Sequence, residues 1–205
     1  ANSMGYQVVT CTTAVMRIDG FAMMPNFTFG MAIATFVGQN IGANKLDRVN
    51  RGTKDILRIS LTASFMLVAL LMIFGRNLIG MFTTTEEIIR LGIRQLRILA
   101  VGYVAVAITQ VFGGIMRGAG DTMPTMWISL LSTVGIRVPL AYLWAWLTRS
   151  ATYPQGSPDA VFFSLLLSWV AGSVGTYLWY RRGTWKTKAL VPLSEPGQDQ
   201  PQAAS

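Results

Sequence analysis

Apolar residues gather in five long stretches that short polar segments separate. These stretches cover about residues 7–37, 57–80, 94–116, 123–147 and 160–180. An α-helix rises about 1.5 Å per residue, so roughly 20 apolar residues cross the hydrocarbon core of a bilayer. The stretch 160–180 contains no charged residue, whereas the first stretch contains two charges and a proline. The pattern therefore predicts an all-α, polytopic transmembrane bundle of about five spans.

The composition is typical of a membrane protein and limits the kinds of catalytic and metal-binding site that the chain can form. Of the residues, 52% are hydrophobic and only 13% are charged, about half the charged share of a soluble domain. A single cysteine, Cys11, excludes an intrachain disulfide, and the lack of histidine excludes an imidazole base or a His-ligated metal. We therefore expect no enzyme, no metal site and no bound cofactor.

The net charge of +8 would suggest nucleic acid in a soluble protein, but its distribution indicates a membrane topology. Ten of the seventeen Lys and Arg residues fall on the side that holds loops 38–58 and 117–122 and the C-terminus. Five fall on the other side, and the remaining two lie inside spans. This bias predicts that the first side is cytoplasmic and that the protein binds lipid bilayer, not nucleic acid. On the other side, Glu86 and Glu87 are spaced to pair with Arg90 along one helix.

Residues 111–126, VFGGIMRGAGDTMPTM, form a glycine-rich turn between two spans. Gly118 and Gly120 permit a tight reversal, and Asp121 can cap the next helix. Arg117 ends the incoming helix, where we expect it at the level of the lipid headgroups. No Lys-Ser/Thr pair follows the glycines, so a phosphate-binding loop is excluded.

A second glycine-rich turn lies at TFVGQNIGANKLDRVNRGTKD, residues 35–55. We expect Gly38 and Gly42 to end the first span and the charged residues after them to form a surface helix. Gln39 and Asn40 have two readings: they line a cytoplasmic mouth, or their amides satisfy backbone groups freed at the break.

Four motifs occur in order: FGMAIATFVGQNIGA with a basic segment after it, MFTTTEEI, GGIMRGAGDTMPT and IRVPLAYL. Together they resemble the MATE family of multidrug and toxin extrusion transporters over about residues 5–182. The resemblance implies twelve helices in two six-helix lobes. Residues 1–182 would form most of the C-terminal lobe without its first helix, and residues 183–205 a cytoplasmic tail, disordered from about 192.

The resemblance also implies a function. Such proteins are secondary active antiporters of the plasma membrane that export drugs or organic cations in exchange for Na⁺ or H⁺. Substrates would be small cationic or amphipathic compounds, and the missing first lobe would be a partner or part of the same chain. Two alternatives stay open: a lipid-linked sugar flippase of the related superfamily, and a split or truncated lobe that does not transport.

One position departs from the family pattern. In NorM-type members, the helix before the RGAGDT turn carries an aspartate about three helical turns before the arginine. That position falls at about Val106 here. The departure argues against NorM-type cation coupling within this lobe and favours a branch nearer the DinF-like proteins.

Three charged residues lie inside the predicted spans and away from their ends: Arg17, Asp19 and Arg137. A charge inside a span is costly unless it is paired or hydrated, so each is a functional candidate. Asp19 either faces a cavity and binds substrate or the coupling ion, or it forms a structural ion pair with Arg137, whose predicted depth is similar.

Other residues at membrane depth are polar or helix-breaking. Pro25 and Pro139 must disrupt backbone hydrogen bonding, and such sites often border transporter cavities. The polar candidates for substrate or ion binding are Asn26, Gln110 and Tyr142, with interhelical hydrogen bonding as the alternative role.

Overall fold

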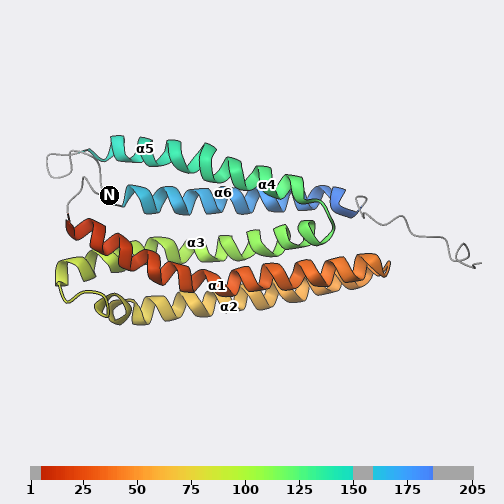
Figure 1. The fold of residues 1–205 in the computed structure, drawn as a ribbon, viewed down its shortest axis with the longest axis horizontal. Coiled ribbons are helices and arrows are strands. Elements are labelled where there is room, and N and C mark those ends of the chain that lie inside the picture. The colour runs from red at the N-terminus through yellow and green to blue at the C-terminus, as the bar shows by residue number, and fades with distance from the viewer. Residues whose placement is uncertain (1–5, 150–158, 187–205) are drawn as a thin grey trace, which may run out of the picture.

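The structure, a computed structural model, describes residues 6–149 and 159–186, and all regular elements in these ranges are helices (Figure 1). Five helical segments are long and apolar enough to cross a membrane. They are α1 (Tyr6–Gly42), α2 (Leu46–Gly80), α3 (Glu86–Gly118), the composite segment Thr122–Leu147 and α6 (Ala160–Arg182). The all-α membrane bundle is therefore confirmed. The tail predicted to be disordered from about 192 lies outside the described residues.

The turn between α1 and α2 differs from the prediction. Gly38 lies inside α1, which continues to Gly42. A Cβ on Gly38 would lie 3.3 Å from the carbonyl oxygen of Gly118, so Gly38 permits close helix packing and is not a break. The reversal instead uses Asn44 at φ 53°, since asparagine tolerates the left-handed region better than most residues. The basic residues that follow are not a separate surface helix, because α2 already begins at Leu46.

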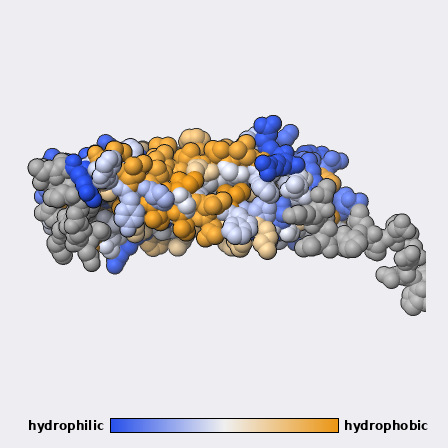
Figure 2. Space-filling model, turned by 90° about the horizontal axis from the view of Figure 1, so that it is seen from above, coloured by the Kyte–Doolittle hydropathy of each residue, from blue (hydrophilic) through white to orange (hydrophobic). Residues whose placement is uncertain are grey.

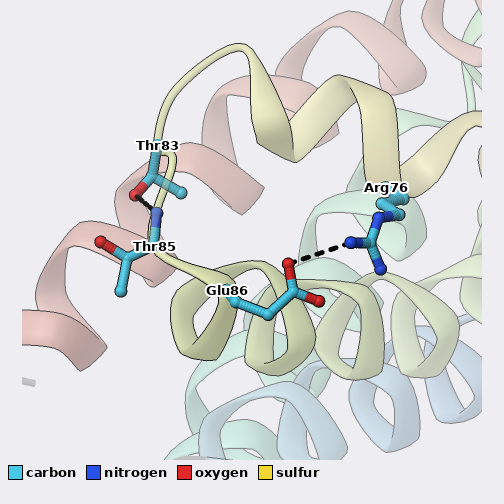
Figure 3. A network of polar contacts seen from close by, with 4 residues as sticks. All are labelled: Arg76, Thr83, Thr85 and Glu86. Atoms are coloured by element: carbon cyan, nitrogen blue, oxygen red, sulfur yellow. Dashed lines mark hydrogen bonds and ion pairs between the residues drawn. The ribbon is translucent and has the colours of Figure 1, made fainter.

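The α2–α3 connection lies at the opposite end of the bundle. Arg76, near the end of α2, forms an ion pair of 3.0 Å with Glu86 in the first turn of α3 (Figure 3). The Thr85 backbone N–H donates to the Thr83 hydroxyl. Glu86 therefore reaches across the turn to α2, and the predicted pairing with Arg90 is wrong for the described residues. Both side chains of the ion pair are more than half exposed, so it contributes about 1 kcal/mol at most.

The fourth crossing is not a regular α-helix. It consists of α4 (Thr122–Leu130), the π-helical segment η2 (Leu131–Ile136) and α5 (Arg137–Leu147). The Arg137 N–H donates to the carbonyl of Ser132, five residues earlier. Pro139 lacks the N–H that would bond the carbonyl of Gly135, which explains why the helix widens immediately before it. The disruption of backbone hydrogen bonding predicted at Pro139 is therefore observed as the π-helical segment η2. Pro25, by contrast, lies within a continuous α1.

Helix α3 packs between α1 and α2 on one side and α6 on the other (Figure 1). Glycines let α1 and α3 approach closely: a Cβ on Gly114 would lie 2.5 Å from Ile33 Cγ2 and still closer to the carbonyl oxygen of Gly30. Small residues at such seams are how membrane helices gain packing contacts without a hydrophobic driving force. The α1–α3 seam is therefore the backbone-to-backbone contact around which the bundle is built.

The outer surface carries an apolar band in the middle and hydrophilic residues at both ends (Figure 2). Large apolar side chains such as Phe21, Ile73 and Leu131 are 60–73% exposed within this chain. Such a surface is unstable in water and suited to lipid. The α1–α2 turn, the α3–α4 turn and the end of α6 all lie at the same end of the bundle (Figure 1).

Candidate functional site

A cavity of about 240 Å³ lies between α1, α3, the fourth crossing and α6. Its walls combine hydroxyl and amide groups with aromatic and sulfur-containing side chains. The lining residues are Met23, Phe27, Val106, Thr109, Gln110, Gly113, Arg117, Thr125, Ile128, Ser129, Ser132, Thr133, Ser168, Trp169, Gly172 and Thr176.

Helical spacing explains how α3 and α6 form two of the walls. On α3, Val106, Gln110, Gly113 and Arg117 recur every three or four residues, so they share one face. On α6, cavity residues recur every four residues from position 168 to position 176. The glycines on both faces add no side chain, which leaves room between the helices.

Arg117 is the only charged residue among the described lining residues, and it is exposed within this chain at the end of α3. Its Nη2 donates to Gln110 Oε1, 3.4 Å away and seven residues earlier on α3, which is roughly 10 Å along the axis. Helical side chains lean toward the N-terminus, and for α3 this direction leads into the bundle. Gly113 makes this course possible: a Cβ there would lie 3.2 Å from Arg117 Nη1.

Gln110 is therefore placed in the cavity by its own helix and by α1. A Cβ on Gly30 would lie 3.0 Å from Gln110 Oε1 and 3.1 Å from its carbonyl oxygen, so α1 presses against this residue from behind. Of the predicted polar candidates, Gln110 is the one that lines the cavity.

Asp19 accepts a hydrogen bond of 2.9 Å from the phenol of Tyr103 on α3. The Tyr103 ring lies 6.1 Å from that of Trp169, which lines the cavity. Among the described residues Asp19 and Arg137 form no ion pair within 4.0 Å. Arg17 instead lies 6.0 Å above the ring of Phe82.

Asn26 and Tyr142 lie outside the cavity. Asn26 is buried and joins three helices, because it accepts from the Ser64 hydroxyl at 2.9 Å and donates to the Tyr103 carbonyl at 3.4 Å. This is the interhelical role stated as the alternative. Tyr142 is 76% exposed on α5 and is not part of the cavity wall.

The residues of the two predicted glycine-rich turns have different roles in the structure. Gly120 has φ 84° and makes the α3–α4 reversal, whereas Gly118 is helical and serves the α1–α3 seam. Asp121 occupies the N-cap position without capping α4, and its carboxylate accepts from Thr184 at 3.2 Å. In the other turn, the Asn40 amide donates to the Phe36 carbonyl at 2.8 Å, while Gln39 is exposed.

The beginning of the predicted tail belongs to the fold. Trp185 is buried, stacks on Tyr180 at 5.5 Å and donates to its carbonyl. Together with the Thr184–Asp121 bond, it fastens the end of α6 to the α3–α4 turn, next to the cavity.

Several contributors were not predicted, among them Tyr103, Thr109, Thr133 and Trp169. Tyr103 and Asp19 are 84 residues apart, so only the packing of α1 on α3 brings them together. Gln110 and Arg117 lie two helical turns apart on one face of α3, and this spacing was a usable signal. Polar residues on one face of an otherwise apolar span indicate a face turned away from lipid.

Comparison with known proteins identifies the family. The sequence profile of the MatE family matches residues 1–143. The chain is 31% identical over 190 residues to the probable multidrug resistance protein YpnP of Bacillus subtilis, covering 92% of this chain and 41% of that protein. It is 23% identical over 176 residues to the probable multidrug resistance protein NorM of Thermotoga maritima, covering 86% and 37%.

A solved structure shares the fold of this chain. The chain matches the inward-facing conformation of a multidrug resistance MATE family transporter of the MOP superfamily with a TM-score of 0.73 and 18% identity, covering 88% of this chain and 43% of that one. The chain thus spans about two fifths of the length of these relatives. The family consists of transporters and not of enzymes, as the sequence predicted. With its five apolar crossing helices, this chain is a multi-pass membrane protein that belongs to the MatE family.

Proposed function

We propose that the full-length protein carrying this chain is a secondary antiporter of the plasma membrane. It exports amphipathic drugs in exchange for H⁺ or Na⁺, and this chain supplies most of its second lobe. The relatives named as multidrug resistance proteins support drug export. The observation that carries the proposal is the cavity of about 240 Å³ inside the lobe, with both polar and aromatic walls.

The chemistry of the cavity favours amphipathic substrates. Phe27, Trp169 and Met23 offer adaptable apolar contacts, and hydroxyl groups of the other walls offer hydrogen bonds. A wide, arginine-lined cavity would favour the alternative of a lipid-linked sugar flippase. A volume of about 240 Å³ with one arginine fits a small ring system better than a lipid-linked sugar.

In this proposal Asp19 takes the coupling ion. Its carboxylate lies inside α1 and is held by the Tyr103 phenol. Loading a proton or Na⁺ on Asp19 changes the charge beside Tyr103, whose ring neighbours Trp169 of the cavity wall. This contact chain links the ion to the substrate space.

Orientation follows from charge. The loops 38–58 and 117–122 and the C-terminus lie on the side richer in Lys and Arg. We assign that side to the cytoplasm.

The test is transport by the full-length protein in lipid vesicles. Norfloxacin, a fluorescent drug with a carboxylate and an amine, is measured under a pH gradient and then under a Na⁺ gradient. We expect one gradient to drive its movement and Asp19→Asn to abolish that response. Asp55→Asn is the matched control, because Asp55 is an exposed carboxylate near the start of α2, 3.8 Å from Arg58.

Each outcome has a clear meaning. A well-folded parent protein that moves no drug under either gradient contradicts the proposed function. Normal gradient-driven transport by Asp19→Asn leaves drug export standing and removes the coupling role of Asp19.

A further inference from the structure

The charge of the cavity is unusual for a site expected to take organic cations. Arg117 is its only charged lining residue, and the described lining contains no carboxylate. Arg117 belongs to none of the ion pairs described within 4.0 Å, which are Arg58–Asp55, Arg76–Glu86 and Arg94–Asp159.

The guanidinium of Arg117 also has hydrogen-bonding capacity to spare. It carries five N–H donors, and its one described hydrogen bond, to Gln110 Oε1, is long at 3.4 Å. Arg117 is exposed within this chain, and a guanidinium binds a planar anionic acceptor with two parallel hydrogen bonds. The inward direction of the side chain presents these donors to whatever occupies the cavity.

Neighbouring wall residues fit the rest of such a ligand. Phe27 on α1 and Trp169 on α6 border the same space and supply aromatic surface. Thr109 and Ser132 add hydroxyl groups. The cavity thus combines one cationic anchor with an apolar compartment.

We propose that this cavity selects amphipathic compounds that present a carboxylate or similar anionic group to Arg117, with an aromatic body against Phe27 and Trp169. The proposal rests on the proposed transport function, because it names the substrate class of that site. Gly113 is the positioning residue: without a side chain, it leaves the space along α3 in which the guanidinium lies.

The test uses three probes with the same ring system and different charge: 2-naphthoate, 2-naphthamide and 2-naphthylmethylammonium. Equilibrium dialysis measures their dissociation constants for the purified full-length protein, without any ion gradient. We expect naphthoate to bind at least about tenfold more tightly than the ammonium compound. Arg117→Gln should abolish this preference.

Two further variants separate the specific effect from a general one. Arg51→Gln removes one positive charge from an exposed position of α2 and should keep the preference. Gly113→Ala keeps the charge but displaces the guanidinium, so it should weaken naphthoate binding more than naphthamide binding. Elution of every variant as a single size-exclusion peak checks that it is folded.

Equal binding of the three probes, tighter binding of the ammonium compound, or no binding of any probe would overturn the inference. So would a preference that persists in Arg117→Gln. If the parent protein moves norfloxacin but does not prefer naphthoate, only this inference fails. If it prefers naphthoate but transports nothing under either gradient, the proposed function fails and the binding preference stands.

Discussion

The seam between α1 and α3 makes Gly118→Ala the sharpest test of the fold. A Cβ on Gly118 would lie 3.0 Å from both the Cα and the carbonyl carbon of Ala34, and closer still to its carbonyl oxygen. Non-bonded carbon atoms prefer about 3.5–4.0 Å. These are backbone atoms, so no rotamer change relieves the contact. The two helices must separate where Gly118 meets Ala34.

The size of the effect follows from two opposing contributions. Overpacking a well-packed site costs about 1–3 kcal/mol, and a backbone clash belongs at the upper end of that range. Replacing glycine by alanine inside a helix recovers about 1 kcal/mol of helix propensity. The net loss is therefore about 2 kcal/mol, which lowers the melting temperature of a domain of this size by about 4–8 °C.

The measurement is the melting temperature of the full-length protein in detergent, monitored as the loss of its monodisperse size-exclusion peak on heating. Gly20→Ala is the matched control, because Gly20 is also inside a helix and nothing lies within 4 Å of the added Cβ. We expect the control to melt at or slightly above the parent temperature. If Gly118→Ala melts as high as Gly20→Ala, the helices are not in backbone contact and the reasoning is refuted.

Three other substitutions test separate parts of the structure. Asn26→Leu leaves the Ser64 hydroxyl and a buried carbonyl without their partner, so thermal unfolding should show a loss of about 1–3 kcal/mol. Burial raises the pKa of Asp159, and Arg94, 2.7 Å away, opposes this. Arg94→Gln should raise the pKa of Asp159 further. A carboxyl whose pKa is higher in the folded than in the unfolded protein costs stability as the pH rises. The melting temperature of the variant relative to the parent should therefore fall from about pH 4 upward. Pro139→Ala restores an N–H donor, so it should convert η2 to a regular α-helix and change naphthamide binding. Unchanged binding would show that the π-helical form of η2 does not affect the cavity.

The crossing helices were predictable because membrane insertion depends on long apolar runs, and these are visible in any single sequence. The ends of the helices were less predictable. Gly38 was expected to break α1, since glycine disfavours helices in water. In a membrane bundle the same residue permits close packing, and this depends on a partner, Gly118, that lies 80 residues later in the sequence.

The cavity could be predicted only in part, because its walls come from four separate helical segments. Gln110 was identified as a polar residue at membrane depth, and it does line the cavity. Asn26 was also identified as a polar residue at membrane depth, but its side chain forms hydrogen bonds to α2 and α3 instead. A sequence indicates how deep in the membrane a polar residue lies but not toward which neighbouring helix it points. For Asn26 that direction is set by the packing of α1 on its neighbours. The direction of the Arg117 side chain depends likewise on Gly113 and Gln110.

The seam and the cavity meet at Gly30, and this contact allows their roles to be separated. Gly114 and Gly118 face α1, whereas Gln110 reaches from the same seam into the cavity. In Gly30→Ala the new Cβ would press on the flexible Gln110 side chain at 3.0 Å and on its carbonyl at 3.1 Å, so a shift of a few tenths of an ångström suffices. We expect the free energy of unfolding to stay within about 1 kcal/mol of that of the parent protein. Naphthoate binding should weaken about tenfold, because Gln110 Oε1 is the group that holds Arg117. Gly20→Ala again serves as the control. If binding stays unchanged while stability falls, Gln110 is part of the packing seam and does not position the arginine.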